Sequence, residues 1–460
     1  MQFNDSVRKV ATGLEFGGRH TISKSEILPG VSLTCINTGK FKSGCMTVNF
    51  LCELNRETAA LNALLPRVLR RGSKSLPDME SISAALDDLY GARVEPVIRK
   101  KGELQCIGFY TDFTDDRYLP AGENVLERAV EIIGEILLSP YMSDENLCGD
   151  YTESEKSNLV DDIRAAINDK RGYAIDRLLE EMCAGEAYGI SKLGSETDVL
   201  AITKEKLTAH YKNIVLTSRI EILYCGSAGP DRIEAAIRST FKSLPERDVG
   251  KIPETSVIYR PRTDTPRRFK DNLDVSQGKL TIGFRIGKAM KNPDYPALMM
   301  LNSIFGGCVS SKLFKNVREK LSLCYYAGSM IDKHKGVLLV SSGVEFLKFD
   351  DALNEILAQL ECIKNGDIDD GEFLSAKRSV ITSLKSAFDR PGTLEEMYFD
   401  STVSAISYDP VKLSDMVDSV TPERVIDSAS EIKLDSIYLL YGLEGTNGQN
   451  PVQEADDGIY

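Results

Sequence analysis

The sequence predicts an α+β protein made of two copies of one domain, each a largely antiparallel sheet with helices packed on one face. Two pairs of similar segments indicate the repeat. TVNF at 47–50 resembles TIGF at 281–284, and IEILY at 220–224 resembles IYLLY at 437–441. Between the copies, residues 245–271 carry four prolines among charged side chains, a composition typical of a linker.

The repeat divides the chain of 460 residues, which is too long for one ordinary hydrophobic core. We expect residues 1–250 to form an N-terminal domain and residues 251–445 to form a C-terminal domain. Residues 446–460 are rich in Gly, Asn, Gln and Asp, and we expect them to be a disordered tail.

Hydrophobic periodicity predicts the elements of both copies. Apolar and alternating runs predict strands at 31–36, 45–51, 104–111, 219–225, 279–285, 337–344 and 436–441. Apolar residues at helical spacing predict helices at 57–71, 78–90, 124–138, 153–183, 231–241, 295–305, 350–364 and 372–388. Gly72 and Gly91 end the first two helices, and Pro140 follows the third.

Composition narrows the class of protein. Contents of 42% hydrophobic and 27% charged residues are typical of a globular protein. A formal net charge of −13 argues against a nucleic-acid partner, because phosphates attract clustered Lys and Arg. The ten Cys form no Cys-x-x-Cys pair, which predicts reduced thiols and a cytoplasmic location. No apolar stretch has the length of a signal core or a membrane span, so we expect no membrane partner.

The most informative stretch is NSIFGGCVSSKLFKNVREKLSLCYY at 302–326. It predicts a helix end, a break at Gly306 and Gly307, a second short helix and then a strand. The apolar residues of the second helix, which we expect to face inward, are Leu313, Phe314 and Val317.

This stretch resembles the insulinase/pitrilysin family of zinc metallopeptidases. In the family, a Gly-Gly turn precedes a helix of the pattern S-x-L-F/Y-x-x-[IV]-R-E-K-x-x-L-x-Y and a strand. The matching residues are Gly306, Gly307, Ser311, Leu313, Phe314, Arg318, Glu319, Lys320, Leu323 and Tyr325. The resemblance implies the two-domain fold of the mitochondrial processing peptidase and insulinase type over about residues 20–445. It also implies that Arg318 and Tyr325 bind the substrate peptide. Otherwise Arg318 would cap a helix and Tyr325 would pack in a sheet.

The zinc motif of the family is missing. Active subunits carry His-x-x-Glu-His on the first helix, where the two His bind zinc and the Glu acts as general base. The Gly72-Ser73 ending aligns that pattern with Ala63 and Arg67 at the His positions and Pro66 at the Glu position. Ala63 has no donor atom, Arg67 is a permanent cation, and Pro66 strains a helix interior.

By the same resemblance, Asp162 stands at the position of the third zinc ligand. We expect Asp162 to lie on a solvated helix face, with a buried ion pair between Asp162 and Arg67 as the alternative. The three His of the chain, His20, His210 and His334, have no metal-ligand spacing, so no metal or other cofactor is predicted.

These residues predict a non-catalytic family member. The leading hypothesis is the substrate-positioning subunit of a two-component zinc peptidase of the bacterial and mitochondrial branch. Its partner would be a sister subunit that carries His-x-x-Glu-His, and the heterodimer would enclose unfolded peptides. The alternative is a stand-alone peptide-binding or assembly homodimer. A third hypothesis, an enzyme with unrelated chemistry, has no motif in its favour.

Overall fold

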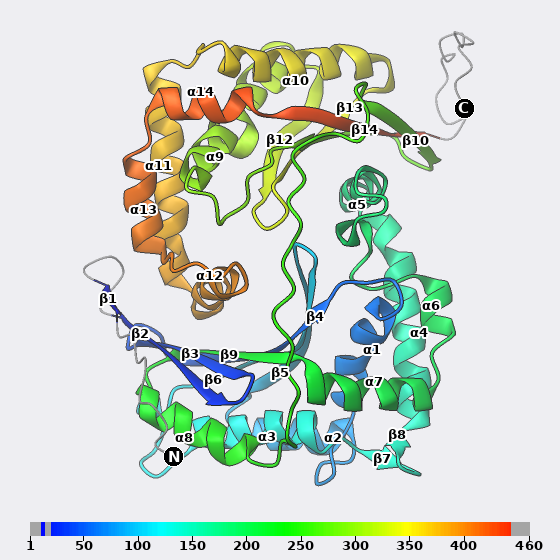
Figure 1. The fold of residues 1–460 in the computed structure, drawn as a ribbon, viewed down its shortest axis with the longest axis vertical. Coiled ribbons are helices and arrows are strands. Elements are labelled where there is room, and N and C mark those ends of the chain that lie inside the picture. The colour runs from blue at the N-terminus through cyan, green and yellow to red at the C-terminus, as the bar shows by residue number, and fades with distance from the viewer. Residues whose placement is uncertain (1–10, 14–19, 443–460) are drawn as a thin grey trace.

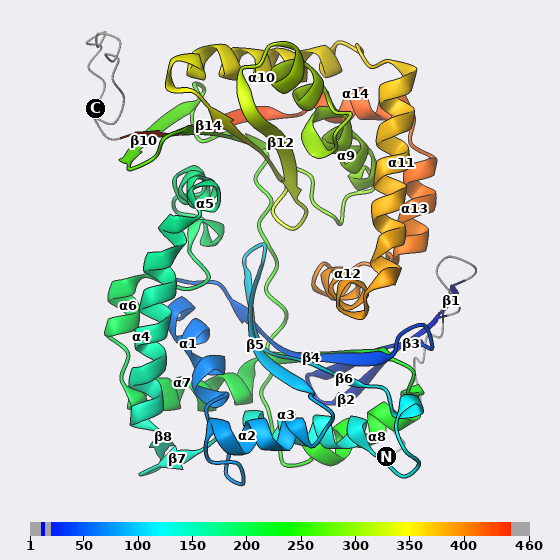
Figure 2. The same cartoon turned by 180° about the vertical axis from the view of Figure 1, so that it is seen from behind.

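The computed structural model describes residues 11–13 and 20–442, and the tail predicted at 446–460 lies outside the described residues. Two sheets, one from each half of the chain, lie at opposite ends of the molecule (Figure 1). Helices cover the outer face of each sheet, and the inner faces look toward each other (Figures 1 and 2).

The two sheets share one strand order. The first sheet runs β1-β2-β3-β9-β4-β6-β5 and the second runs β10-β14-β11-β13-β12. The last five strands of the first sheet therefore match the whole second sheet. Each sheet has one parallel pair, β3–β9 or β10–β14, at the equivalent place, and its other pairs are antiparallel. Their bounds are β1 Ala11–Gly13, β2 His20–Leu28, β3 Val31–Thr38, β4 Ser43–Glu53, β5 Arg93–Lys101, β6 Leu104–Thr114, β9 Arg219–Gly226, β10 Arg267–Leu273, β11 Gly278–Arg285, β12 Cys324–Asp332, β13 Val337–Val344 and β14 Lys433–Gly442.

This order confirms the predicted fold class of two similar, largely antiparallel α+β halves. The repeated segments fall on equivalent strands, β4 with β11 and β9 with β14. The domain boundary at residue 250 stays a prediction. The predicted linker at 245–271 overlaps β10 by its last five residues, which pair with β14.

Helices at 196–200, 391–403, 410–418 and 422–430 were not predicted, and the predicted helices agree with the structure except at 153–183. There the chain forms two helices rather than one, because the Asp169 side chain accepts hydrogen bonds from the backbone N–H groups of Arg171 and Gly172 and starts a new helix. The bounds are α1 Ala59–Leu69, α2 Met79–Asp87, α3 Val125–Leu138, α4 Gly149–Ala165, α5 Lys170–Met182, α6 Glu196–Leu200, α7 Lys204–Thr217, α8 Pro230–Phe241, α9 Tyr295–Asn302, α10 Phe349–Lys364, α11 Asp370–Ser386, α12 Pro391–Val403, α13 Pro410–Asp418 and α14 Pro422–Ser430.

Each half covers the inner face of the other half's sheet with one helix. Helix α5 of the first half packs Ala174 and Leu178 against the second sheet (Figure 1). Helix α12 of the second half packs Leu394, Tyr398 and Phe399 against the first sheet. Burial of each large apolar side chain contributes about 1.5–3 kcal/mol, so these exchanged helices hold the halves together.

The tips of the β5–β6 and β12–β13 hairpins meet near the centre of the molecule (Figures 1 and 2). Lys335, at the second tip, is fully buried. Its Nζ donates to Glu103 Oε1 of the first tip at 2.6 Å and to the carbonyl oxygen of Ser256 at 2.7 Å, and it lies 2.7 Å from Glu186 Oε2. One ammonium group therefore joins three separate segments of the chain.

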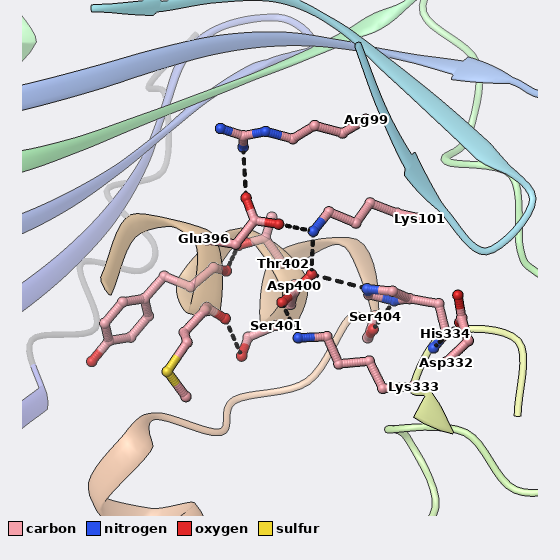
Figure 3. A network of polar contacts seen from close by, with 12 residues as sticks. Arg99, Lys101, Asp332, Lys333, His334, Glu396, Asp400, Ser401, Thr402 and Ser404 are labelled. Atoms are coloured by element: carbon pink, nitrogen blue, oxygen red, sulfur yellow. Dashed lines mark hydrogen bonds and ion pairs between the residues drawn. The ribbon is translucent and has the colours of Figure 1, made fainter. Parts of the chain in front are cut away.

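A second charge cluster surrounds Asp400 of α12 (Figure 3). Its carboxylate accepts hydrogen bonds from Lys101 Nζ at 2.7 Å and His334 Nε2 at 2.9 Å, and it also pairs with Lys333. Burial raises the pKa of the Asp400 carboxyl, but the His334 hydrogen bond and the lysine charges outweigh burial and hold it well below its usual range. The cluster thus ties the first hairpin tip to the second half.

We predict that Lys335→Met lowers the free energy of unfolding by about 3 kcal/mol, because it leaves the Glu103 carboxylate without its buried cation. Glu186 keeps Arg285 at 2.6 Å, which limits the loss. The chain has no Trp, so urea unfolding is followed by far-UV circular dichroism.

The matched control is Lys291→Met. Lys291 forms an exposed pair with Glu254 at 3.7 Å, and we expect its removal to cost less than about 1 kcal/mol. Equal losses in the two variants would contradict the role given to Lys335.

Candidate functional site

Helix α1 carries the three positions that the family resemblance assigns to the zinc motif. Ala63 is fully buried in the core of the first half, and Pro66 lies inside the helix. Arg67 Nη2 lies 2.7 Å from Asp162 Oδ2 of α4. The ion pair considered as an alternative is therefore formed. It is not a buried pair, because the Asp162 side chain is 54% exposed.

A second ion pair, which the sequence analysis missed, lies beside the first. Arg71 Nη1 donates to Glu155 Oε1 at 3.0 Å, and its guanidinium lies over the Tyr151 ring. Arg67 and Arg71 are four residues apart and share one face of α1, while Glu155 and Asp162 are seven apart and share one face of α4. The spacing of these charges along the two helices is the feature of the sequence from which the two ion pairs could have been predicted.

The residues at this interface do not fit a zinc ion. A dication here would meet two guanidinium groups, and neither motif position supplies a neutral nitrogen ligand. In the part of the chain that the structure describes, no group of three or more His, Cys, Asp or Glu is arranged to hold a metal.

A buried polar chain lies on the other side of α1. His210 Nε2 of α7 is 2.7 Å from Asn62 Oδ1, and Asn62 Nδ2 donates to Gln105 Oε1 at 2.8 Å. Gln105 Nε2 in turn donates to the carbonyl oxygen of Ala59 at 3.0 Å. Because Asn62 Oδ1 is an acceptor, His210 Nε2 is the donor. Burial lowers the pKa of His210 to about 4, which keeps the ring neutral near pH 7.

We predict that His210 makes the protein less stable in acid. The unfolded chain binds the proton near pH 6.5, whereas folded His210 binds it only near pH 4. Stability is therefore complete above about pH 7 and falls as the pH drops from about 6.5 to 4. The loss is on the order of 2 kcal/mol at pH 5.

In His210→Gln, the side-chain amide keeps a donor toward Asn62 but does not titrate. We expect the difference in unfolding free energy between pH 7.5 and pH 5 to shrink by about that amount. An unchanged difference would exclude His210 as its source.

The motif helix of the second half is a π-helix, Leu313–Lys320, in which the Leu321 N–H donates to the Asn316 carbonyl oxygen. Leu313 and Val317 are buried, as predicted, whereas Phe314 is only partly buried. Arg318 is exposed, and its guanidinium carbon lies 4.6 Å from the centre of the Phe314 ring. The aromatic ring supports the cation and presents it to solvent. π-Helical turns are frequent at functional sites.

Tyr325 lies at a β-bulge. The register of β12 against β13 shifts between Cys324 and Tyr326, and Tyr325 is 63% exposed. The alternative that Tyr325 packs within the sheet is therefore wrong. A bulge inserts an extra residue and changes the direction of a side chain, and here the Tyr325 side chain lies in solvent.

The two glycines of the motif allow close packing. A Cβ atom on Gly306 would lie 2.6 Å from the backbone N of Ser329 in β12, and one on Gly307 would lie 2.7 Å from Asn302 Nδ2. Neither glycine has a positive φ, so the requirement is space rather than an unusual backbone conformation.

The structure places the site residues in two separate groups. Ala63, Pro66, Arg67 and Asp162 belong to the helices of the first half, and Arg318 and Tyr325 belong to the second half. Across residues 20–442, no hydrogen bond or ion pair connects the two groups. The substrate-binding role of Arg318 and Tyr325 stays a prediction.

Comparison with known proteins also indicates a peptidase relative without activity. A family model described as "Peptidase M16 inactive domain" matches residues 201–380. A Bacillus subtilis protein named "Probable inactive metalloprotease YmfF" is 32% identical over 418 residues, which cover 91% of this chain and 97% of that protein. The chain belongs to the insulinase/pitrilysin family of M16 peptidases. It is a non-catalytic M16 protein. The assignment of Ala63, Pro66 and Arg67 to the zinc-motif positions stays a prediction.

Solved structures show the same fold. A conserved protein from Enterococcus faecalis V583 aligns with a TM-score of 0.83 at 25% identity and covers 93% of this M16 chain and 100% of that chain. A structure from Pseudomonas fluorescens, titled as a peptidase M16 inactive domain, aligns with a TM-score of 0.72 at 16% identity, over 94% and 100% of the two chains.

Among the described residues, no helix combines the length and the apolar character that crossing a membrane requires.

Proposed function

We propose that this M16 protein is the substrate-positioning subunit of a two-component zinc peptidase. The observation that carries the proposal is the contrast between the two groups of site residues. Arg318 and Tyr325 are exposed on the second half, whereas Arg67 and Asp162 neutralise each other at the former metal position. Among the described residues, the second half therefore offers exposed hydrogen-bond donors for a peptide, and no group of three or more His, Cys, Asp or Glu is arranged to hold a metal.

The proposed partner is a sister subunit of the same family that carries an intact His-x-x-Glu-His helix. In the heterodimer, the partner's zinc would activate water, and this chain would hold the unfolded peptide in line with it. The ten cysteines, all of them free, support a reducing, cytoplasmic location for the pair.

We predict that Arg318→Ala lowers kcat/KM for peptide hydrolysis by the reconstituted pair about 10- to 100-fold. This range corresponds to the 1.5–3 kcal/mol of a hydrogen bond from a charged donor. Because Arg318 is exposed and lies over the partly buried Phe314 ring, we expect the far-UV circular dichroism spectrum and the unfolding midpoint to stay unchanged.

The control is Arg378→Ala on α11, which removes an equally exposed arginine outside the motif. We expect it to leave kcat/KM within about twofold of wild type, as for a surface change away from the site. Equal rates for Arg318→Ala and wild type would remove Arg318 from the site. If the purified chain binds peptides as a homodimer and no zinc-bearing sister associates with it, the stand-alone alternative replaces the two-subunit proposal.

A further inference from the structure

Two cations flank one aromatic ring on the inner face of the second sheet. Tyr326 follows the exposed Tyr325 in β12. The guanidinium carbon of Arg171, at the start of α5, lies 4.7 Å from the centre of the Tyr326 ring. Lys279 Nζ of β11 lies 5.7 Å from the same centre. We call Arg171, Lys279 and Tyr326 the cation cluster.

Neither cation has a carboxylate partner among the described residues. Lys279 Nζ donates to the amide oxygen of Gln277 at 2.8 Å. The carboxylate near Tyr326, that of Asp169, accepts from the backbone N–H groups of Arg171 and Gly172 as the cap of α5. Burial and then the charge of Arg171 lower the pKa of Lys279. Two like charges thus lie close together, and neither forms an ion pair with a described carboxylate.

Three hydroxyl groups beside the ring also lack partners. Thr281 and Ser341 are buried and lie directly opposite each other on β11 and β13. The Tyr326 hydroxyl lies close to Ser341. None of the three oxygens has a hydrogen-bond partner of acceptable geometry. Buried polar groups almost always have one, so these three hydroxyls mark an unsatisfied polar region beside the ring.

We propose that the cation cluster binds a carboxylate of the substrate peptide, so that the substrates are peptides with an acidic residue or a free C-terminal carboxylate. A carboxylate accepts several hydrogen bonds at once, and the exposed Arg171 and the half-buried Lys279 supply charged donors of the required kind. This inference rests on the proposed function, because Tyr325 and Tyr326 are neighbours in β12 and would face the same bound chain.

The test compares two fluorescein-labelled, unstructured peptides of equal length with amidated C-termini, which differ only in three Glu residues replaced by Gln. Binding to the full chain is followed by fluorescence anisotropy at low salt and at 0.5 M NaCl. We expect the acidic peptide to bind about tenfold more tightly at low salt, which corresponds to about 1.4 kcal/mol. The preference should weaken at high salt, which screens partly exposed charges.

In the double variant R171Q/K279Q, we expect the preference to fall to within twofold, with unchanged affinity for the Gln peptide. The control R128Q/K206Q removes the same two charge types from α3 and α7 in the outer helix layer and should keep the preference. An equal loss in both variants would assign the preference to net charge and overturn the proposal.

If the wild-type chain binds both peptides equally well, the role proposed for the cation cluster is overturned, but the proposed function is not. If neither peptide binds, to the chain alone or to the chain with its zinc-bearing partner, both proposals are overturned.

Discussion

The buried ammonium group of Lys335 is the contact on which the arrangement of the two halves depends. It lies where the tips of two equivalent hairpins meet, and its partners come from the first hairpin, the segment after α5 and the linker. An ammonium group with no exposed surface is tolerated only when carboxylates and carbonyls surround it. The tip of the β12–β13 hairpin is therefore stable in this position only together with the first hairpin, the linker and the segment after α5.

The contacts around Lys335 fix the position of the second half, which carries Arg318 and Tyr325, relative to the first half, which carries Arg67 and Asp162. Helices α5 and α12 cross from one half to the inner sheet face of the other, and the Asp400 cluster secures α12 at the same centre (Figure 3). The second sheet, whose strand β12 carries Tyr325, is thereby held at a fixed place relative to the first half. Arg67 and Arg71 join α1 to α4 by ion pairs, next to the positions that the family resemblance assigns to the metal ligands.

Much of the fold could be predicted from the sequence, because apolar periodicity reports which face of each strand or helix is buried. The repeat of β4 in β11 and of β9 in β14 was visible in the residues themselves. The loss of the zinc motif was equally visible, since Ala63 and Pro66 have no donor. The sequence predicts the pairing of Arg67 with Asp162 only as an alternative, and it does not predict that the Asp162 side chain of this pair is exposed.

The remaining features depend on contacts between distant segments. Strand β2 and the strand-forming end of the linker are polar, so their pairing in the sheets left no apolar pattern. The charged tip around Lys335 has the composition of a surface turn, and nothing local shows that it is buried against Glu103. The outward position of Tyr325 follows from a bulge, which is set by the register with β13. Secondary-structure propensity depends on the residues of one segment, whereas the burial of Lys335 and the exposure of Tyr325 depend on the segments that pack against them.

The central claim is that this chain holds peptides while a partner holds the metal. The most direct measurement is the zinc content, by elemental analysis, of the chain purified alone and of the complex that co-purifies with it from the native cell. The account predicts no stoichiometric zinc in the chain alone and one zinc per pair of subunits in the complex. One full equivalent of zinc in the isolated chain would contradict it.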